Sequence, residues 1–74
     1  MPKLYSARQI LSASKRAGFT QVSQKGSHIK LTKKQSEKTL IVIVPFHKEV
    51  ALGTFQSILK QASLTREEFE KFIR

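Results

Sequence analysis

Two histidines are the side chains of this sequence best suited to acid–base chemistry near neutral pH. His28 follows a Gly-Ser pair, and His47 follows a Pro-Phe pair. The sequence has no cysteine, no glycine-rich phosphate loop, no paired carboxylates and no group of residues with metal-ligand spacing. Glu49 and His47 are too isolated to predict a metal site. We therefore take His28 as the first candidate for catalysis and His47 as the second, and we expect no metal or other cofactor.

The charge of the chain favours a polyanionic partner. Its 14 lysines and arginines outnumber five acidic residues and give a formal net charge of +9. Residues 1–36 contain eight of the cations and no acid, whereas three glutamates gather at positions 67–70. The positive electrostatic field of such a surface makes nucleic acid the default partner. An inert basic surface and a surface that docks an acidic protein are the alternatives.

The length of the chain limits what kind of site it can build. Its 74 residues make one domain, over residues 1–74, with a small core and no deep cofactor pocket. A site must therefore be shallow or lie at an interface. The longest apolar run, residues 40–44, is too short to cross a membrane, and the N-terminus lacks the apolar stretch of a secretory signal. We expect a cytoplasmic protein with no membrane partner.

The first predicted element is a helix over residues 7–17. Ser6 and Gln9 have the spacing of a capping box, and apolar residues follow at helical intervals. Gly18 can adopt the left-handed conformation that commonly ends a helix.

Three strands are predicted next, over residues 20–24, 27–32 and 39–44, with a flexible polar turn over residues 33–38. The density of β-branched residues makes the third strand the strongest of the three.

The second strand provides the most useful geometric inference. Ile29 and Leu31 alternate with His28 and Lys30 along it. If the two aliphatic side chains point into the core, His28 and Lys30 stand together on the opposite, open face. A lone histidine on a strand is more often an ordinary surface residue, but the open face, the neighbouring lysine and the positive field favour a role in catalysis.

Two more helices are predicted after the sheet. Thr54 is the expected N-cap of the first, and its apolar stripe runs to about Ala62. Thr65 and Glu68 form a second capping box, from which a short helix runs to about Ile73. The fold class is therefore α+β, with a helix, a three-stranded antiparallel sheet, a helix and a short C-terminal helix, and with one sheet face open.

Several segments together resemble HicA-type mRNA interferase toxins in order and spacing, over nearly the whole chain. The more specific ones are the Gly-Ser-His segment and the Pro-x-His segment with the later Gly-Thr pair. The segments are Leu11, Ala17–Phe19, Gln24–Lys30, Val44–His47, Gly53-Thr54, Ile58–Ala62, Leu64-Thr65 and Glu68-Phe69.

The resemblance implies a fold similar to double-stranded RNA-binding domains. It also implies the toxin role in a type II toxin–antitoxin system, an endoribonuclease activity that cleaves mRNA and inhibits translation, and neutralisation by a HicB-like antitoxin. The catalytic histidine of the family maps onto His28, and His47 also falls on the family pattern.

These expectations lead to a metal-independent mechanism. The 2′-hydroxyl of a ribose attacks the adjacent phosphate while His28 assists a proton transfer, and the second transfer falls to His47, a lysine or water. Nearby lysines stabilise the phosphate oxygens. The expected RNA-binding residues are Lys25, Ser27, Lys30, Lys33 and Lys34. The main alternative is a double-stranded-RNA-binding-like module that binds RNA without cutting it. A basic adaptor for an acidic polypeptide is the third.

Overall fold

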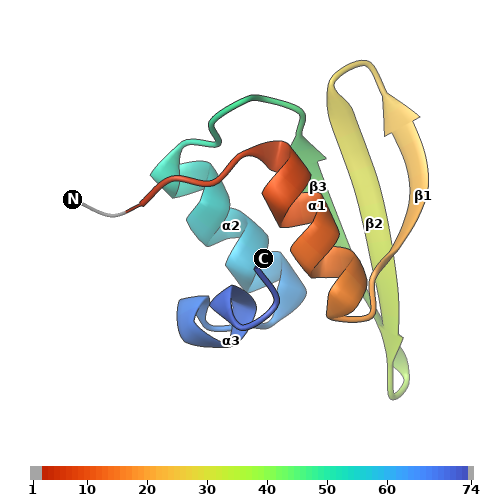
Figure 1. Ribbon diagram of the computed structural model, residues 1–74. Coiled ribbons are helices and arrows are strands. Elements are labelled where there is room, and N and C mark those ends of the chain that lie inside the picture. Colours follow the sequence, from red (N-terminus) through yellow and green to blue (C-terminus); the bar gives the residue numbers. More distant parts are fainter. Residues whose placement is uncertain (1–2, 74) are drawn as a thin grey trace.

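A computed structural model describes residues 3–73 of the chain (Figure 1). The elements follow one another as a helix, three strands and two helices. They are α1 (Ala7–Arg16), β1 (Thr20–Lys25), β2 (His28–Gln35), β3 (Lys38–Pro45), α2 (Leu52–Ala62) and α3 (Arg66–Glu70). The predicted α+β class and element order are confirmed. No helix within the described residues is long and apolar enough to cross a membrane.

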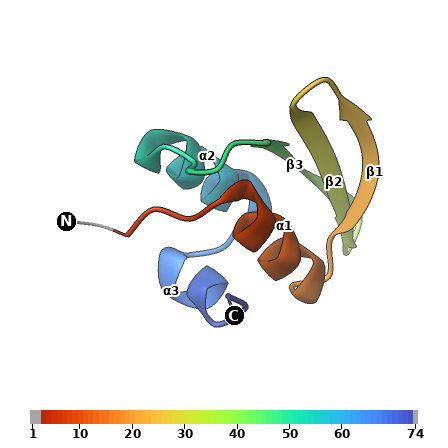
Figure 2. The same ribbon diagram turned by 45° about the horizontal axis from the view of Figure 1, so that its top comes forward.

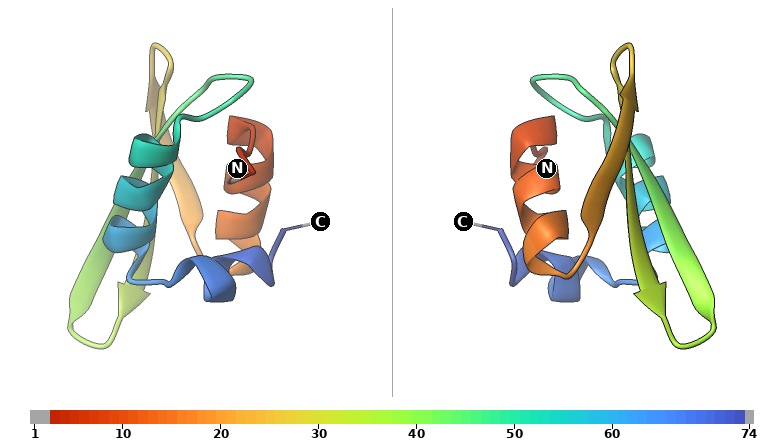
Figure 3. Two further views of the ribbon diagram at one scale, coloured as in Figure 1. Left: turned by 90° about the vertical axis from the view of Figure 1, so that its left-hand side faces the viewer. Right: turned by 90° about the vertical axis from the view of Figure 1, so that its right-hand side faces the viewer.

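The three strands form one antiparallel sheet in the order β1-β2-β3. Helices α1 and α2 lie over the same face of this sheet, and α3 contacts both of them at the end of the helical layer (Figures 1 and 2). The views from either side show no element over the other face (Figure 3). That face is therefore open in the described part of the chain, as the sequence predicts.

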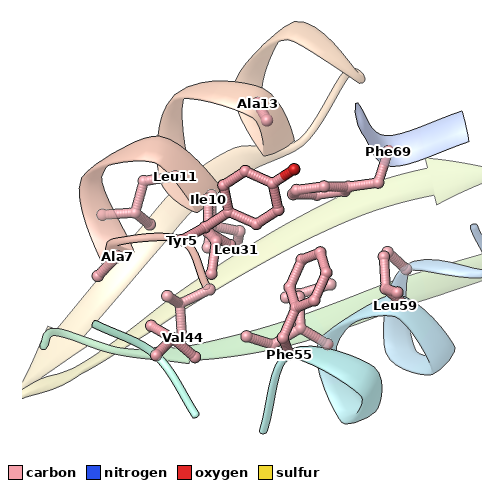
Figure 4. Close-up of a cluster of buried hydrophobic side chains, with 14 of the residues drawn as sticks. Tyr5, Ala7, Ile10, Leu11, Ala13, Leu31, Val44, Phe55, Leu59 and Phe69 are labelled. Carbon is pink, nitrogen blue, oxygen red and sulfur yellow. The ribbon is translucent and has the colours of Figure 1, made fainter. Parts of the chain in front are cut away.

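The core lies between the sheet and the helices (Figure 4). Aliphatic residues of β2 and β3 form its floor, and an aromatic group made by Tyr5, Phe55 and Phe69 fills the space above them. The ring of Phe55 is 5.4 Å from each of the other two rings, centroid to centroid, in tilted and edge-on arrangements that aromatic pairs favour. Every residue of this group is less than a tenth exposed.

Both ends of α1 are fixed by local sequence. Ser6 and Gln9 form the predicted capping box, with side-chain and backbone groups bonded reciprocally. At the other end, Gly18 has a φ of +104°, and the N–H of Phe19 donates to the carbonyl of Ser14 over 2.9 Å. The N–H of Gly18 donates to the carbonyl of Lys15 over 3.1 Å, and the two bonds together form a Schellman motif, in which the positive φ of glycine lets the chain turn away from the helix.

The prediction of a flexible turn over residues 33–38 is wrong. Strand β2 continues to Gln35, β3 begins at Lys38, and only Ser36 and Glu37 connect them. Ser36 takes a φ of +57° to make this tight turn. The polar composition of this hairpin end reflects its exposure to solvent, because it extends beyond the helices (Figure 3). Polarity here indicates exposure and not the absence of a strand.

The predicted start of α2 is also wrong. Ala51 is the N-cap, the helix begins at Leu52, and Thr54 lies within the first turn without capping it. The helix starts early because of the residue that precedes its N-cap. Val50 is buried in the core and donates its N–H to the Tyr5 carbonyl over 2.8 Å, so the chain turns into the helix directly after it.

The last helix is shorter than predicted. The capping box of Thr65 and Glu68 is present, but α3 ends at Glu70. Phe72 and Ile73 continue with bonds to the third residue before each, so the chain tightens as it leaves the helix.

Candidate active site

His28 is the first residue of β2 and its side chain is exposed. It lies between Lys25 of β1 and Pro45 of β3 in the sheet register. Ile29 and Leu31 are buried, so the strand alternation directs His28 and the partly exposed Lys30 to the open face, as expected. The two polar side chains are neighbours along one face of the same strand.

His47 is in the loop that joins β3 to α2, and backbone hydrogen bonds hold this loop in place. The carbonyl of His47 accepts from the N–H of Ala7, the first residue of α1, over 3.0 Å. Just before it, the N–H of Phe46 donates to the carbonyl of Ser27 over 2.6 Å. The loop is thus attached both to the start of α1 and to the turn that precedes His28. All of these segments lie at the same end of the molecule (Figures 1 and 3).

One surface groove brings the two histidines together. It has a volume of about 500 Å³ and lies between the end of the sheet and α2. The polar side chains that line it are His28, His47, Glu49, Thr54, Ser57 and Gln61. Two exposed imidazoles in one open groove can accept and donate protons at oxygen atoms of a molecule that enters from solvent.

A side chain of α2 also contacts the edge strand β3 at this groove. The N–H of Ile43 in β3 donates to the Oε1 atom of Gln61 over 3.0 Å. A strand edge with free N–H groups is a site for unwanted pairing, and a helix side chain here occupies one of them. This bond fixes the position of α2 relative to the strand that leads to His47.

Four groove residues are absent from the prediction made on the sequence. Thr54, Ser57 and Gln61 lie on α2 at intervals of three and four residues, and Glu49 belongs to the preceding loop. The helical spacing of these three polar residues is the signal that identifies a second polar face on α2.

The groove does not form a metal site from the described residues. Although His28, His47 and Glu49 all line it, no three histidine, aspartate or glutamate side chains within residues 3–73 come close enough to hold one ion.

The remaining predicted RNA-binding residues fall into two groups. Lys25 is the last residue of β1 and Ser27 lies in the turn to β2, so both are next to His28. Lys33 lies on the helical side of β2, where its ammonium donates to the carbonyl of Ala17 over 2.8 Å and sits over an aromatic ring of the core. Lys34 is exposed but lies six residues beyond His28, roughly 20 Å along the strand. The structure therefore separates Lys33 and Lys34 from the groove.

Comparison with known proteins identifies the family of the chain. The family described as the HicA toxin of bacterial toxin–antitoxin systems matches residues 7–64, a span that contains both histidines and every polar residue of the groove. No curated protein matches the chain. Because the match covers most of the sequence, the chain belongs to the HicA toxin family of bacterial toxin–antitoxin systems.

Proposed function

We propose that this toxin is an endoribonuclease that cleaves mRNA and inhibits translation, with His28 as a catalytic residue. The observation that carries the proposal is the single groove that contains His28 and His47. Membership of the HicA family supports the toxin role, and the net charge of +9 suits an RNA substrate.

The reaction needs two proton transfers. A base removes the proton of a ribose 2′-hydroxyl, the 2′-oxygen forms a bond to the adjacent phosphorus, and the bond from phosphorus to the 5′-oxygen breaks. An acid protonates the leaving 5′-oxygen, so the products are a 2′,3′-cyclic phosphate and a 5′-hydroxyl. His28 and His47 supply one transfer each, and the reaction requires no electron carrier or further reactant.

Nearby lysines stabilise the charge that develops on the phosphate. Lys25 is the register partner of His28, and Lys30 is on the same face two residues farther along β2. Cationic donors beside the non-bridging oxygens lower the barrier most when they are already in place before the reaction. The short β1–β2 connection holds Lys25 next to His28 in this way.

The family also gives the toxin an antitoxin partner. We propose a HicB-like antitoxin, encoded beside this chain, and a cytoplasmic site of action where mRNA is available. The antitoxin then has to block RNA access to the groove.

Replacement of His28 tests the proposal. We expect His28→Ala to lower RNA cleavage by about 10²- to 10⁴-fold, the contribution of one acid–base group, and to abolish growth inhibition. The fold should persist because the side chain is exposed and its neighbours Ile29 and Leu31 hold the strand. Cleavage of a labelled RNA and a thermal melt of each purified protein measure the two effects.

Gln35→Ala is the matched control. Gln35 is an exposed polar residue at the opposite end of the same strand, and its replacement should leave cleavage at the parent rate. A His28→Ala protein that folds and cleaves like the parent contradicts the catalytic role. A parent protein that binds RNA without shortening it supports the RNA-binding module instead.

A further inference from the structure

Phe46 is an exception among the aromatic residues of this protein. Phe19, Phe55 and Phe69 are buried, but Phe46 is 45% exposed. The other exposed large apolar residues of the described chain, Val22 and Ile41, are single aliphatic side chains on strands. Nearly half of Phe46 is therefore accessible to a ligand.

The ring lines a hollow of its own. This hollow has a volume of about 490 Å³ and is lined by Ser6, Arg8, Phe46, His47 and Lys48. Its lining residues come from the β3–α2 loop and from the start of α1, and these two segments are joined by the bond from the Ala7 N–H to the His47 carbonyl. None of its lining residues is acidic, and two of them are permanently cationic near neutral pH.

The hollow adjoins the catalytic groove. His47 lines both, and the Phe46 N–H is bonded to the carbonyl of the residue that precedes His28. Phe46 directly follows Pro45, which is the register partner of His28, so the hollow begins one residue beyond the end of β3. A chain of RNA bound with a phosphate at the histidines therefore reaches the hollow with its neighbouring nucleotide.

The chemistry of the hollow matches a nucleotide. A flat aromatic face binds a nucleobase by stacking, and Arg8 and Lys48 suit the phosphates on either side of it. We propose that Phe46 stacks on the nucleobase next to the cleaved phosphate, so that the substrate of this toxin is single-stranded RNA. The bases of a duplex already stack on each other and are not free to stack on the ring. This inference rests on the proposed nuclease function for the position of the cleaved bond, but the stacking site can be measured without cleavage.

Binding to a protein that cannot cut provides the test. In the His28→Ala background, we expect a short single-stranded RNA with 2-aminopurine at successive positions to bind and to lose fluorescence at one of them. Phe46→Ala should remove this quenching and weaken binding about tenfold to a hundredfold, the loss of one base–aromatic stack. Phe46→Tyr in the same background should keep both the quenching and the affinity, because it keeps the ring. A duplex of the same sequence should bind more weakly than the single strand and show no dependence on Phe46.

Val22→Ala is the matched control, since Val22 is 53% exposed and lies outside the hollow. If Phe46→Ala in the His28→Ala background binds RNA as tightly as the His28→Ala protein, the proposal is overturned. Undiminished binding of an RNA with an abasic site at the quenched position also overturns it. A Phe46→Ala protein that keeps RNA binding but no longer binds its antitoxin also overturns it, because the ring is then a protein anchor. If the parent protein fails to cleave RNA while the quenching persists, the nuclease proposal fails and the stacking site remains.

Discussion

The two histidines are separated in the chain by the rest of β2 and the whole of β3, and each is held by contacts of its backbone. Strand pairing fixes His28 between Lys25 and Pro45, and a hydrogen bond to α1 fixes the backbone of His47. Acid–base catalysis needs both groups within reach of one phosphodiester, so this fixation matters more than either side chain alone. At the scale of residues, the proposed mechanism therefore divides two roles between two histidines.

An activated substrate separates the two roles. A ribonucleotide 3′-(4-nitrophenyl) phosphate has a leaving group that departs without a proton. We expect one of the variants His28→Ala and His47→Ala to regain most of its activity on this substrate, because it lacks only the acid, and the other to stay inactive. Release of nitrophenolate measures the rates. Equal behaviour of the two variants on both substrates contradicts this division of roles.

The attacking group of the proposed reaction belongs to the RNA. We expect replacement of the 2′-hydroxyl by hydrogen at the cleaved position to block cutting there, and DNA of the same sequence to bind uncut. Cleavage should persist in the presence of a chelator. Gel analysis of labelled strands provides the measurement, and cutting of the deoxy substrate or an absolute need for an added divalent metal contradicts the mechanism.

At the scale of elements, the end of α1 depends on one glycine. Gly18 has a φ of +104°, and a Cβ added to it would meet the Lys33 Cε at 3.2 Å. The Lys33 ammonium also donates to the carbonyl of Ala17, and this bond holds the Lys33 side chain beside Gly18. We expect Gly18→Ala to lower the free energy of unfolding by about 1–3 kcal/mol, measured by urea denaturation.

Gly53→Ala is the matched control for this prediction. Gly53 lies in the first turn of α2 without a positive φ, and an added Cβ meets nothing within 4 Å. The replacement should be neutral or raise the free energy of unfolding by up to about 1 kcal/mol, since alanine favours the helix. A Gly18→Ala protein as stable as the parent shows that the helix end does not need a left-handed residue.

The elements also show which parts of the structure the sequence predicts. Capping boxes and the Schellman glycine depend on residues close together in the chain, and they are confirmed at Ser6, Gly18 and Thr65. The face of His28 follows from strand alternation and is also confirmed. The start of α2 is different, because it depends on the burial of Val50 and on a bond to Tyr5 from the far end of the chain. The groove requires such long-range contacts, so its α2 residues could not be assigned from local pattern alone.

At the scale of the whole molecule, one contact joins the two ends of the chain. The hydroxyl of Tyr5 donates to the Glu70 carboxylate over 2.6 Å, and Arg66 forms an ion pair with the same carboxylate at 3.0 Å. The Tyr5 hydroxyl, followed by Arg66, lowers the pKa of Glu70, while the bond to Glu70 raises the pKa of Tyr5. Both shifts favour the pair of a neutral tyrosine and a charged glutamate.

These shifts predict how stability depends on pH. A lowered pKa of Glu70 in the folded state stabilises the protein above the ordinary carboxyl pKa near 4.5, and this contribution is lost as the pH falls through the folded value. We expect the Glu70→Gln protein to melt at a lower temperature than the parent at pH 7. The difference in melting temperature between the two proteins should narrow in acid. Thermal melts of both proteins across the pH range measure it. Glu67→Gln, a replacement of a neighbouring exposed glutamate, is the control. A constant difference at every pH contradicts the linkage.

The distribution of charge over the whole molecule predicts how the antitoxin binds. The net charge is +9, and the groove, its flanking Lys25 and Lys30 and the hollow with Arg8 and Lys48 lie at one end of the sheet. The glutamates at positions 67–70 belong to α3, at the far end of the helical layer (Figure 1). An antitoxin that is acidic where it meets the groove is attracted by the same field that attracts RNA, so it competes for the same surface.

We therefore expect a tight complex that covers His28 or blocks RNA access to it, and that neither cleaves RNA nor binds it through this end of the sheet. Its association should slow as salt is raised, because screening shortens the range of the attraction. Stopped-flow mixing at increasing salt measures the association rate, and RNA cleavage by the purified complex measures the inhibition. Lys25→Glu in the toxin should slow association more than Lys38→Glu, an equal change of charge at the opposite end of the sheet. Undiminished cleavage at saturating antitoxin, or an interface confined to the α3 end with His28 open to solvent, contradicts inhibition by occupation of the groove.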